Sequence, residues 1–591
     1  MTTAFRFRRP IQVAAALVLA LGALATRPAF AEAAEDQAAD QTAPAAAPGE
    51  LKTVAVVAVS SYNQLIGDVG FMGSLADRPE LGQMIEGTIA LFTQGKGLNG
   101  IDKTKPWGVI LQTDGQQFLP VACLPVTDLN QVLGIAQGFG AKTQDTPDGG
   151  KQIDLPNGKS IFVKTGTGWA FLAQSANSLE HLPADPQAAL GDLVTNYDLG
   201  ARISVQNVPA TYRQLAVGAM KSGMEQGLQR KEGEDDATYE GRRKMAEAQM
   251  QQVERMVNEI DDITFGWAVD SKQQQTFLDF TYRFVADSKM AKQIASYDKP
   301  HTNFAGFFQP DAALTMNFAS KADPQLIKED MEQFRAMIDT MRKQAEKAID
   351  EENDLPDQTS RDALKGAMND FLDAAQATIE AGQMDGGAAV VLHPDSLTVV
   401  AGFLVKQPEK FESGLKKIAE VGAKEPDFGG VQWNAANHAG INFHTMSVPV
   451  PEDQEDARKM LGDKVDVAVG IGTDSVYVAI GRDNMDAINK AIDASRAEPN
   501  KEVKPFELSL ALGPIMETAA ANGKEEDQES LQAIAELLNN TAQGRDHIRI
   551  TGQFIANGLR YRIEAEEGVL RAIGKGVSEA QKKAQEAQKP N

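Results

Sequence analysis

Apolar residues along the chain follow two periods, one typical of strands and one typical of helices. Short apolar runs bounded by turn residues predict strands, and longer stretches with apolar residues three and four apart predict helices. Opening strands are predicted at Thr53–Val59, Ala201–Val208, Ala313–Ala319 and Phe506–Leu512. Each precedes a helical stretch with a polar break, at Asp77–Glu80, Lys231–Ala237, Asp350–Gln358 and Gly523–Ser530. Since such breaks end helices, we expect four αα-hairpins of unequal length.

The third αα-hairpin has the clearest pattern. Its first helix is predicted to carry the stripe Ile327, Met331, Phe334, Ile338, Met341, Ala345 and Ala348. Its second helix carries the matching stripe Leu364, Met368, Phe371, Ala375 and Ile379. These spacings place each set on one helix face, as at a helix–helix seam. A methionine-rich stripe serves either as gap-filling core, which we favour, or as a site for a flexible apolar ligand.

A β-hairpin is predicted after each αα-hairpin. These β-hairpins start at Trp107, Ile263, Ala388 and Ile548, with turns at Asp114-Gly115, Asp270-Ser271, Pro394-Asp395 and Asn557-Gly558. Turn residues between two apolar runs are the usual sign of a hairpin. A helix follows, capped in the first case by Thr127 or Asp128 and in the second by Asp287.

The second strands of the first and third β-hairpins echo each other, as VACLPV (Val121–Val126) and VAGFLV (Val400–Val405). After these hairpins only, an insert of strand, glycine-containing turn, strand and helix follows, from Gly158 and from Val465. The repeated order predicts an internal duplication, with halves at residues 51–300 and 301–577. Hairpins beside helices predict an α+β fold of antiparallel sheets, with helices and long αα-hairpins packed on one face.

The two ends of the chain differ from these halves. Residues 1–31 hold Arg6, Arg8 and Arg9, the apolar run Ile11–Ala25 and Ala29-Phe30-Ala31, which together are typical of a secretory signal peptide. The run is shorter than the about 20 residues of a membrane span, which favours cleavage before Glu32 over retention as an anchor. Residues 32–50 are rich in Ala, Pro and acids and predict a disordered tether. Residues 578–591 predict a polar tail that frays.

The composition narrows the possible partners and the source of stability. The chain has 58 basic and 82 acidic residues; the signal holds four Arg and no acid, so its removal leaves 54 against 82, a net charge of −28. Such a charge repels nucleic acid and anionic membrane surfaces, and its simplest role is solubility. With Cys123 as the one cysteine, stability must come from core burial, without an internal disulfide.

Two glycine-rich motifs do not have the context that phosphate binding requires. Gly95–Gly100 matches G-x-G-x-x-G, but it follows a predicted helix where a dinucleotide site follows a strand, so a helix end and loop is expected. Gly568–Gly576 hints at a phosphate loop, but a Gly replaces the Ser or Thr that would hold Mg²⁺. No cofactor is predicted.

No residues are assigned as metal ligands or catalytic groups. The histidines are His181, His301, His393, His438, His444 and His547. Only His438 and His444 are close in sequence, and on one extended strand they would lie about 20 Å apart, too far for a shared metal. The acidic loop Asp350–Gln358 lacks the Gly and the Glu of a calcium-binding EF-hand loop.

The aromatic and thiol side chains in the predicted strands have structural interpretations. Trp107, Trp169, Trp267 and Trp433 lie in or beside strands, where large aromatic residues are usually core, although they would also suit a sugar site. Cys123 lies in a strand that is apolar on both faces, with no His nearby. We expect a buried, inert thiol there.

The signal peptide, the tether and the segments Asp395–Glu420 and Pro106–Leu133 resemble the uncharacterised exported proteins of planctomycete-type bacteria. The resemblance implies an exported protein, periplasmic or secreted, and implies no activity and no site residues. We therefore expect a non-catalytic, soluble scaffold or binding protein of the bacterial cell envelope. The alternatives are a carrier of an apolar ligand between sheet and helices, and an exported hydrolase whose site is not visible as a motif. The partner is expected to be a protein or an apolar ligand.

Overall fold

The computed structural model describes residues 50–587, apart from residues 231–232, 235, 298, 324–327, 353–354, 356, 425–427 and 543. The predicted signal peptide and all but the last residue of the tether lie outside the described residues, as do Ile327 and parts of two predicted helix breaks. The described chain divides into two compact units. Unit 1 comprises residues 226–250 and 292–528, and unit 2 comprises residues 50–225, 251–291 and 529–587.

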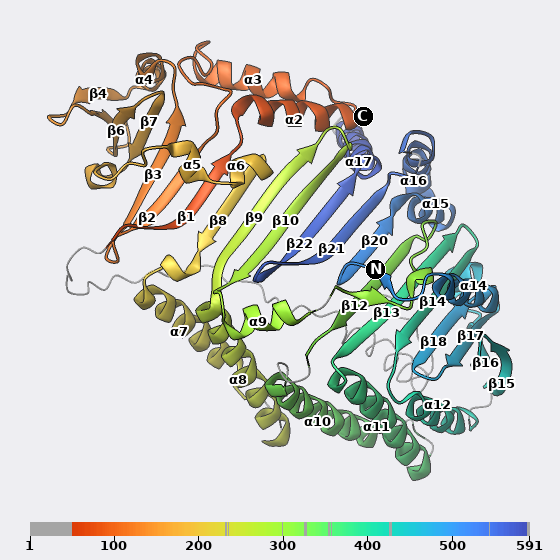
Figure 1. Ribbon diagram of the computed structural model, residues 1–591. Helices are drawn as coiled ribbons and strands as arrows, with labels where there is room; N and C mark the ends of the chain where they lie inside the picture. The colour runs from red at the N-terminus through yellow and green to blue at the C-terminus, as the bar shows by residue number, and fades with distance from the viewer. Residues whose placement is uncertain are drawn as a thin grey trace. The chain divides into compact units, whose positions relative to one another are not determined.

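Unit 2 is built on one antiparallel run of strands, in the order β4-β5-β6-β7-β3-β2-β1-β8-β9-β10-β22-β21 (Figure 1). The strands are β1 (Lys52–Val59), β2 (Trp107–Thr113), β3 (Phe118–Pro125), β4 (Lys142–Asp145), β5 (Lys151–Asp154), β6 (Ser160–Gly166), β7 (Trp169–Ala173), β8 (Leu199–Ser204), β9 (Ile260–Asp270), β10 (Gln275–Phe284), β21 (His547–Ile555) and β22 (Gly558–Glu566).

The helices of unit 2 connect these strands. They are α2 (Tyr62–Leu75), α3 (Leu81–Phe92), α4 (Leu129–Gly138), α5 (Pro186–Leu190), α6 (Leu193–Asn196), most of α7 (Ala210–Gly227) and α17 (Glu567–Ala587). Three more are divided between the units along the chain: α8 (Asp236–Glu259), α9 (Lys289–Ser296) and α16 (Glu525–Leu537). The tail predicted from residue 578 is helical as far as Ala587.

Unit 1 has a second antiparallel run, in the order β15-β16-β17-β18-β14-β13-β12-β20. Its strands are β12 (Leu314–Lys321), β13 (Gln383–His393), β14 (Ser396–Leu404), β15 (Val431–His438), β16 (Ile441–Pro449), β17 (Lys464–Ile471), β18 (Ser475–Gly481) and β20 (Phe506–Ala511), beside the short pair β11 (His301–Thr302) and β19 (Lys501–Glu502). Its helices are α10 (Lys328–Glu351), α11 (Gln358–Glu380), α12 (Pro408–Gly422), α13 (Glu455–Leu461), α14 (Asn484–Ala497) and α15 (Leu512–Asn522).

Helices cover both faces of the unit 1 sheet around β18. Val476 packs with Phe371 of α11 and Phe411 of α12. Ala479, three residues along the same strand, packs with Ile488 of α14 and with the fully buried Phe307. Because neighbouring strand residues point to opposite faces, the two helix layers lie on opposite sides. The predicted antiparallel α+β fold is confirmed, whereas the helices, predicted on one face, lie on both faces here.

The order strand, two helices, β-hairpin, helix occurs four times along the chain, beginning at β1, β8, β12 and β20. The echoed strands have similar neighbours: β3 lies between β2 and β7, and β14 lies between β13 and β18. Duplication of the halves is an explanation for this order and stays a prediction. The compact units do not follow the expected boundary at residue 300, because the β21–β22 hairpin of the expected second half pairs with β10 of the first.

Local signals placed most of the elements correctly, with small shifts. Asp128 caps α4, since its carboxylate accepts hydrogen bonds from the backbone N–H groups of Asn130 and Gln131. At α9 the capping side chain is Ser288, not Asp287, because its hydroxyl accepts the N–H of Ala291. The break predicted at Gly523–Ser530 is shorter, since α16 already begins at Glu525.

Candidate functional site: an apolar cavity in unit 1

The two neighbouring histidines lie on a hairpin and not on one extended strand. The turn Ala439-Gly440 separates β15 from β16, and both residues have positive φ, as a two-residue hairpin turn requires. His438 Nε2 lies 2.8 Å from Asp493 Oδ1, whereas buried His444 accepts the backbone N–H of Asn434 at 3.0 Å. Burial lowers the pKa of His444. Within the part of the chain that the structure describes, no cluster of three or more His, Cys, Asp or Glu side chains is arranged to hold a metal ion.

The tryptophans differ in their surroundings. Trp169 is buried in the core of unit 2, and half-buried Trp267 donates its indole N–H to Thr276 Oγ1 at 2.9 Å. Trp107 and Trp433 are each 37% exposed, so the expectation of core tryptophans is wrong for these two. Trp433 lies edge-on to the ring of His444, with Lys416 over its face.

A buried charged cluster in unit 2 is a possible catalytic centre that the sequence did not suggest. Asp279 is fully buried and accepts two hydrogen bonds from Arg562, at 2.6 and 2.8 Å, and one from the Tyr197 hydroxyl at 3.0 Å. The guanidinium of Arg562 also stacks on the ring of Phe277. Because these groups satisfy one another, we interpret the cluster as structural.

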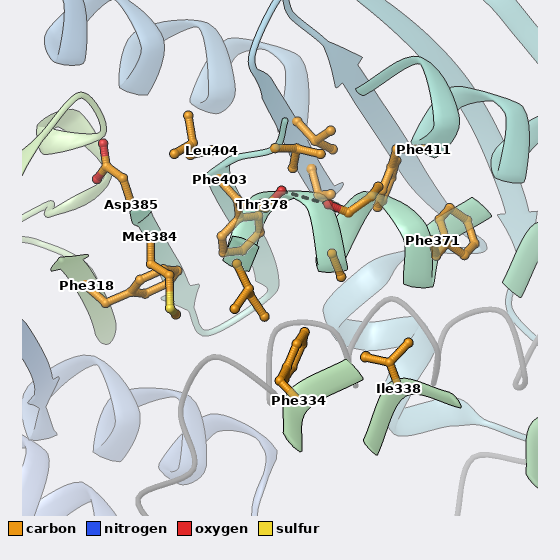
Figure 2. Close-up of a pocket in the computed structure, with 16 residues that line it drawn as sticks. Phe318, Phe334, Ile338, Phe371, Thr378, Met384, Asp385, Phe403, Leu404 and Phe411 are labelled. Atoms are coloured by element: carbon orange, nitrogen blue, oxygen red, sulfur yellow. Dashed lines mark hydrogen bonds between the residues drawn. The ribbon is translucent and has the colours of Figure 1, made fainter. Parts of the chain in front are cut away.

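An apolar cavity of about 140 Å³ lies in unit 1, between the helices α10 and α11 and the sheet (Figure 2). Helices α10, α11 and α12 contribute Phe334, Ile338, Phe371, Ala374, Ala375, Thr378, Ile379 and Phe411 to its wall. The sheet and the residue after β14 contribute Phe318, Met384, Asp385, Phe403, Leu404, Val405, Val476 and Val478. The cavity is therefore a space between two secondary-structure layers, lined mainly by aromatic and aliphatic side chains.

Local geometry explains why these side chains meet. Phe334 and Ile338 are four residues apart on α10, so they share a helix face, and Figure 2 shows both facing the α11 side of the cavity. Phe318 and Phe403 come from β12 and β14, and their rings stack with centroids 6.2 Å apart. On α11 the small residues Ala374 and Ala375 leave space that longer side chains would fill.

The two polar residues in the wall, Thr378 and Asp385, use their polar atoms in hydrogen bonds with the surrounding protein. The hydroxyl of Thr378 donates to Ala374 O at 2.8 Å and accepts the backbone N–H of Lys406 at 3.0 Å. Asp385 accepts the hydroxyl of Thr302 at 2.5 Å and the backbone N–H of Asn303 at 2.9 Å. Figure 2 shows its carboxylate pointing away from Met384 and Phe318.

Burial raises the pKa of Asp385 to about 6, and its hydrogen bonds to Thr302 and to the backbone oppose that rise. The side chain is thus part of the polar interior on the other face of the sheet. What remains inside the cavity is hydrocarbon, aromatic rings and the thioether of Met384, which suits an apolar guest and offers no group for acid–base chemistry.

The helical half of this site could be predicted from the sequence. The methionine-rich stripe was interpreted as core, with an apolar ligand site as the alternative, and Phe334, Ile338, Phe371, Ala375 and Ile379 all line the cavity. Ala348, predicted on the same stripe, is exposed, and the adjacent Ile349 is buried in its place. No sequence signal indicated which strand residues would face these helices.

Comparison with family models, with curated proteins and with solved structures finds no match for this chain. The resemblance to exported planctomycete-type proteins therefore stays an expectation. Over the described ranges, no helix combines the length and the apolar character that crossing a membrane requires.

Proposed function

We propose that this protein is a non-catalytic binding protein for an apolar ligand, which it holds in the cavity between the α10–α11 hairpin and the sheet. The observation that carries the proposal is the cavity wall, in which Thr378 and Asp385 have their polar atoms bonded elsewhere. An exported, soluble protein of the cell envelope would use such a site to shelter an apolar molecule from water.

The volume of the cavity, about 140 Å³, indicates the size of the ligand. An engineered apolar cavity of similar size binds benzene. The buried part of the ligand is therefore of the size of one aromatic ring or the end of an alkyl chain.

The test uses purified residues 32–591 and a series of linear fatty acids of increasing chain length, with benzene as a compact probe. We expect these probes to raise the melting temperature, because a ligand at 100 times its Kd adds about 2.7 kcal/mol to the free energy of unfolding. Mass spectrometry of the intact, freshly purified protein should detect a co-purified apolar molecule.

A cavity-filling variant makes the test specific to this site. Ala375→Leu places a larger side chain in the cavity, so we expect a higher melting temperature without ligand and loss of the ligand-induced increase. Ala348→Leu, at an exposed position of α10, is the matched control and should leave binding unchanged. Binding that survives in Ala375→Leu, or the absence of any ligand-induced increase in the parent, would refute the proposal.

A further inference from the structure

Unit 2 exposes a continuous apolar surface on one face of its sheet, here called the apolar face. Its exposed members come from neighbouring strands and are between 37% and 47% exposed. They are Trp107 and Val109 of β2, Val57 of β1, Leu199 and Ile203 of β8, Phe265 of β9, Leu278 of β10, Ile563 of β22 and Phe118 of β3. None is charged.

The register places these side chains on the same face. Val109 pairs with Val57, which pairs with Ala201 between Leu199 and Ile203. Ala201 pairs with Phe265, and Leu278 pairs with Ile563. From β2 to β22 the face spans six strands, which is about 24 Å at the usual spacing. This is a contiguous patch and not a scatter of single apolar residues.

The opposite face of the same strands is already covered. Val56 and Ala58 of β1 pack with Leu190 of α5 and Leu193 of α6, and farther along lies the Asp279–Arg562 cluster. The core of unit 2 is therefore formed without the apolar face. In unit 1 the α10–α11 hairpin after β12 lines the cavity together with the sheet. In unit 2 the α2–α3 hairpin after β1 instead packs with α17.

Helix α7 continues the apolar surface. Phe118 of the apolar face contacts Tyr212 of α7, with ring centroids 5.0 Å apart. From Tyr212 a stripe at helical spacing runs along α7, comprising Leu215, Ala216, Ala219, Met220 and Met224. Helix α7 has no buried residue, so no described part of unit 2 covers this stripe.

The charges on α7 indicate the chemistry of the occupant. The whole chain carries a net charge of −24, whereas α7 holds Arg213, Lys221 and the single acid Glu225, a net charge of +1. An uncharged sheet face beside a helix with an apolar stripe and a net positive charge is complementary to an amphiphile with hydrocarbon chains and an anionic head.

We infer that the apolar face and α7 bind a single anionic phospholipid molecule, with its acyl chains along the sheet and its phosphate near Lys221. The chains need no hydrogen-bond partners, so they suit a surface that offers none. This site is separate from the cavity in unit 1, and each stands on its own observation.

The experiment measures transfer of a fluorescent phospholipid between vesicles by residues 32–591. Donor vesicles of phosphatidylglycerol and phosphatidylcholine are compared with vesicles of phosphatidylcholine alone. We expect transfer of phosphatidylglycerol and a protein–lipid complex of one lipid per chain in gel filtration. Ile203→Gln combined with Leu278→Gln should reduce transfer by about tenfold or more, because two apolar contacts are lost.

Matched controls separate the site from general effects. Phe139→Ser removes an apolar side chain that is 54% exposed and lies off the apolar face, and it should leave transfer unchanged. Lys221→Glu should remove the preference for phosphatidylglycerol, whereas Lys159→Glu should not. Ala375→Leu in unit 1 should not change phospholipid transfer. Failure of the cavity proposal and failure of the phospholipid proposal therefore give different results. Two results would overturn the inference. One is stable attachment of the protein to vesicles without lipid transfer. The other is a lipid-free dimer that dissociates when Ile203→Gln and Leu278→Gln are combined.

Discussion

Several single residues have roles that depend on partners far away in the chain. Asp68 of α2 is buried, receives hydrogen bonds from Gln64 on both carboxylate oxygens, and shares a hydrogen bond with Asp198. Asp198 in turn accepts the backbone N–H of Val269 at 2.7 Å. Burial and the neighbouring Asp198 carboxyl raise the pKa of Asp68 to about 7.

This raised pKa predicts a stability that falls with pH. In the unfolded chain the pKa of an Asp is about 3.9, so between about pH 4 and pH 7 the folded state holds more protons than the unfolded state. The free energy of unfolding therefore decreases as the pH rises through this window. Asp68→Asn should flatten the dependence and add about 1–3 kcal/mol at pH 8. Urea unfolding at pH 4 and pH 8 measures this, with exposed Asp77→Asn as control; a variant with an unchanged slope would contradict the assignment.

Cys123 is expected to react slowly. It is 1% exposed, lies opposite Gly108 on β2, and burial raises the pKa of its thiol to about 11. Since the thiolate is the reactive form, an aromatic disulfide reagent at pH 8 should label the folded protein far more slowly than the urea-unfolded protein. Ser222→Cys in a Cys123→Ala background supplies an exposed thiol for comparison. Equal rates for the two thiols in the folded state would show that the prediction is wrong.

At the scale of elements, local sequence determines where most helices and strands begin and end, and packing against neighbouring strands adjusts these positions. The fourth hairpin was predicted to turn at Asn557-Gly558, but Ile555 pairs with Gly558, so the turn residues are Ala556 and Asn557. Gly558 belongs to β22, where a Cβ would lie 2.1 Å from Tyr282 O on the adjacent β10. The glycine is required there by a close approach between strands and not by the turn.

The seam between α10 and α11 offers a prediction at this scale. Ile338 is fully buried and packs against Met368 and Leu372. Ile338→Ala removes that packing and enlarges the adjacent cavity, so we expect a loss of about 2–5 kcal/mol in the free energy of unfolding. Ala348→Gly, on the exposed side of α10, should cost only about 1 kcal/mol, from helix propensity. Chemical denaturation measures both, and similar losses would show that the seam is not tightly packed.

At the scale of the whole molecule, the expected halves are not separable along the chain. Strand β22 pairs with β10 along its length, from Gln275 opposite Glu566 to Arg283 opposite Gly558. Cutting the chain at residue 300 therefore removes a neighbouring strand from β10, and it also removes Arg562 from buried Asp279.

We expect residues 51–300 expressed alone to aggregate or to unfold without cooperativity, because an unpaired buried carboxylate costs about 3–5 kcal/mol and the open edge invites association. Co-expression with residues 301–591 should restore a soluble complex. Gel filtration and thermal unfolding of the two preparations decide the point. A stable, monomeric fragment 51–300 would contradict this prediction.

The sequence by itself determined the elements and their order: four αα-hairpins, the β-hairpins with most of their turns, and the two helix stripes that supply Phe334, Ile338, Phe371, Ala375 and Ile379 to the cavity. These follow from periodicity and capping, which involve residues a few positions apart. The tertiary structure alone decided that β22 lies beside β10, that Asp279 meets Arg562 across 283 residues, and that no described segment covers the apolar face. Alternation along a strand shows that one face is apolar, but whether a helix, a ligand or water covers it depends on packing between segments that are distant in sequence.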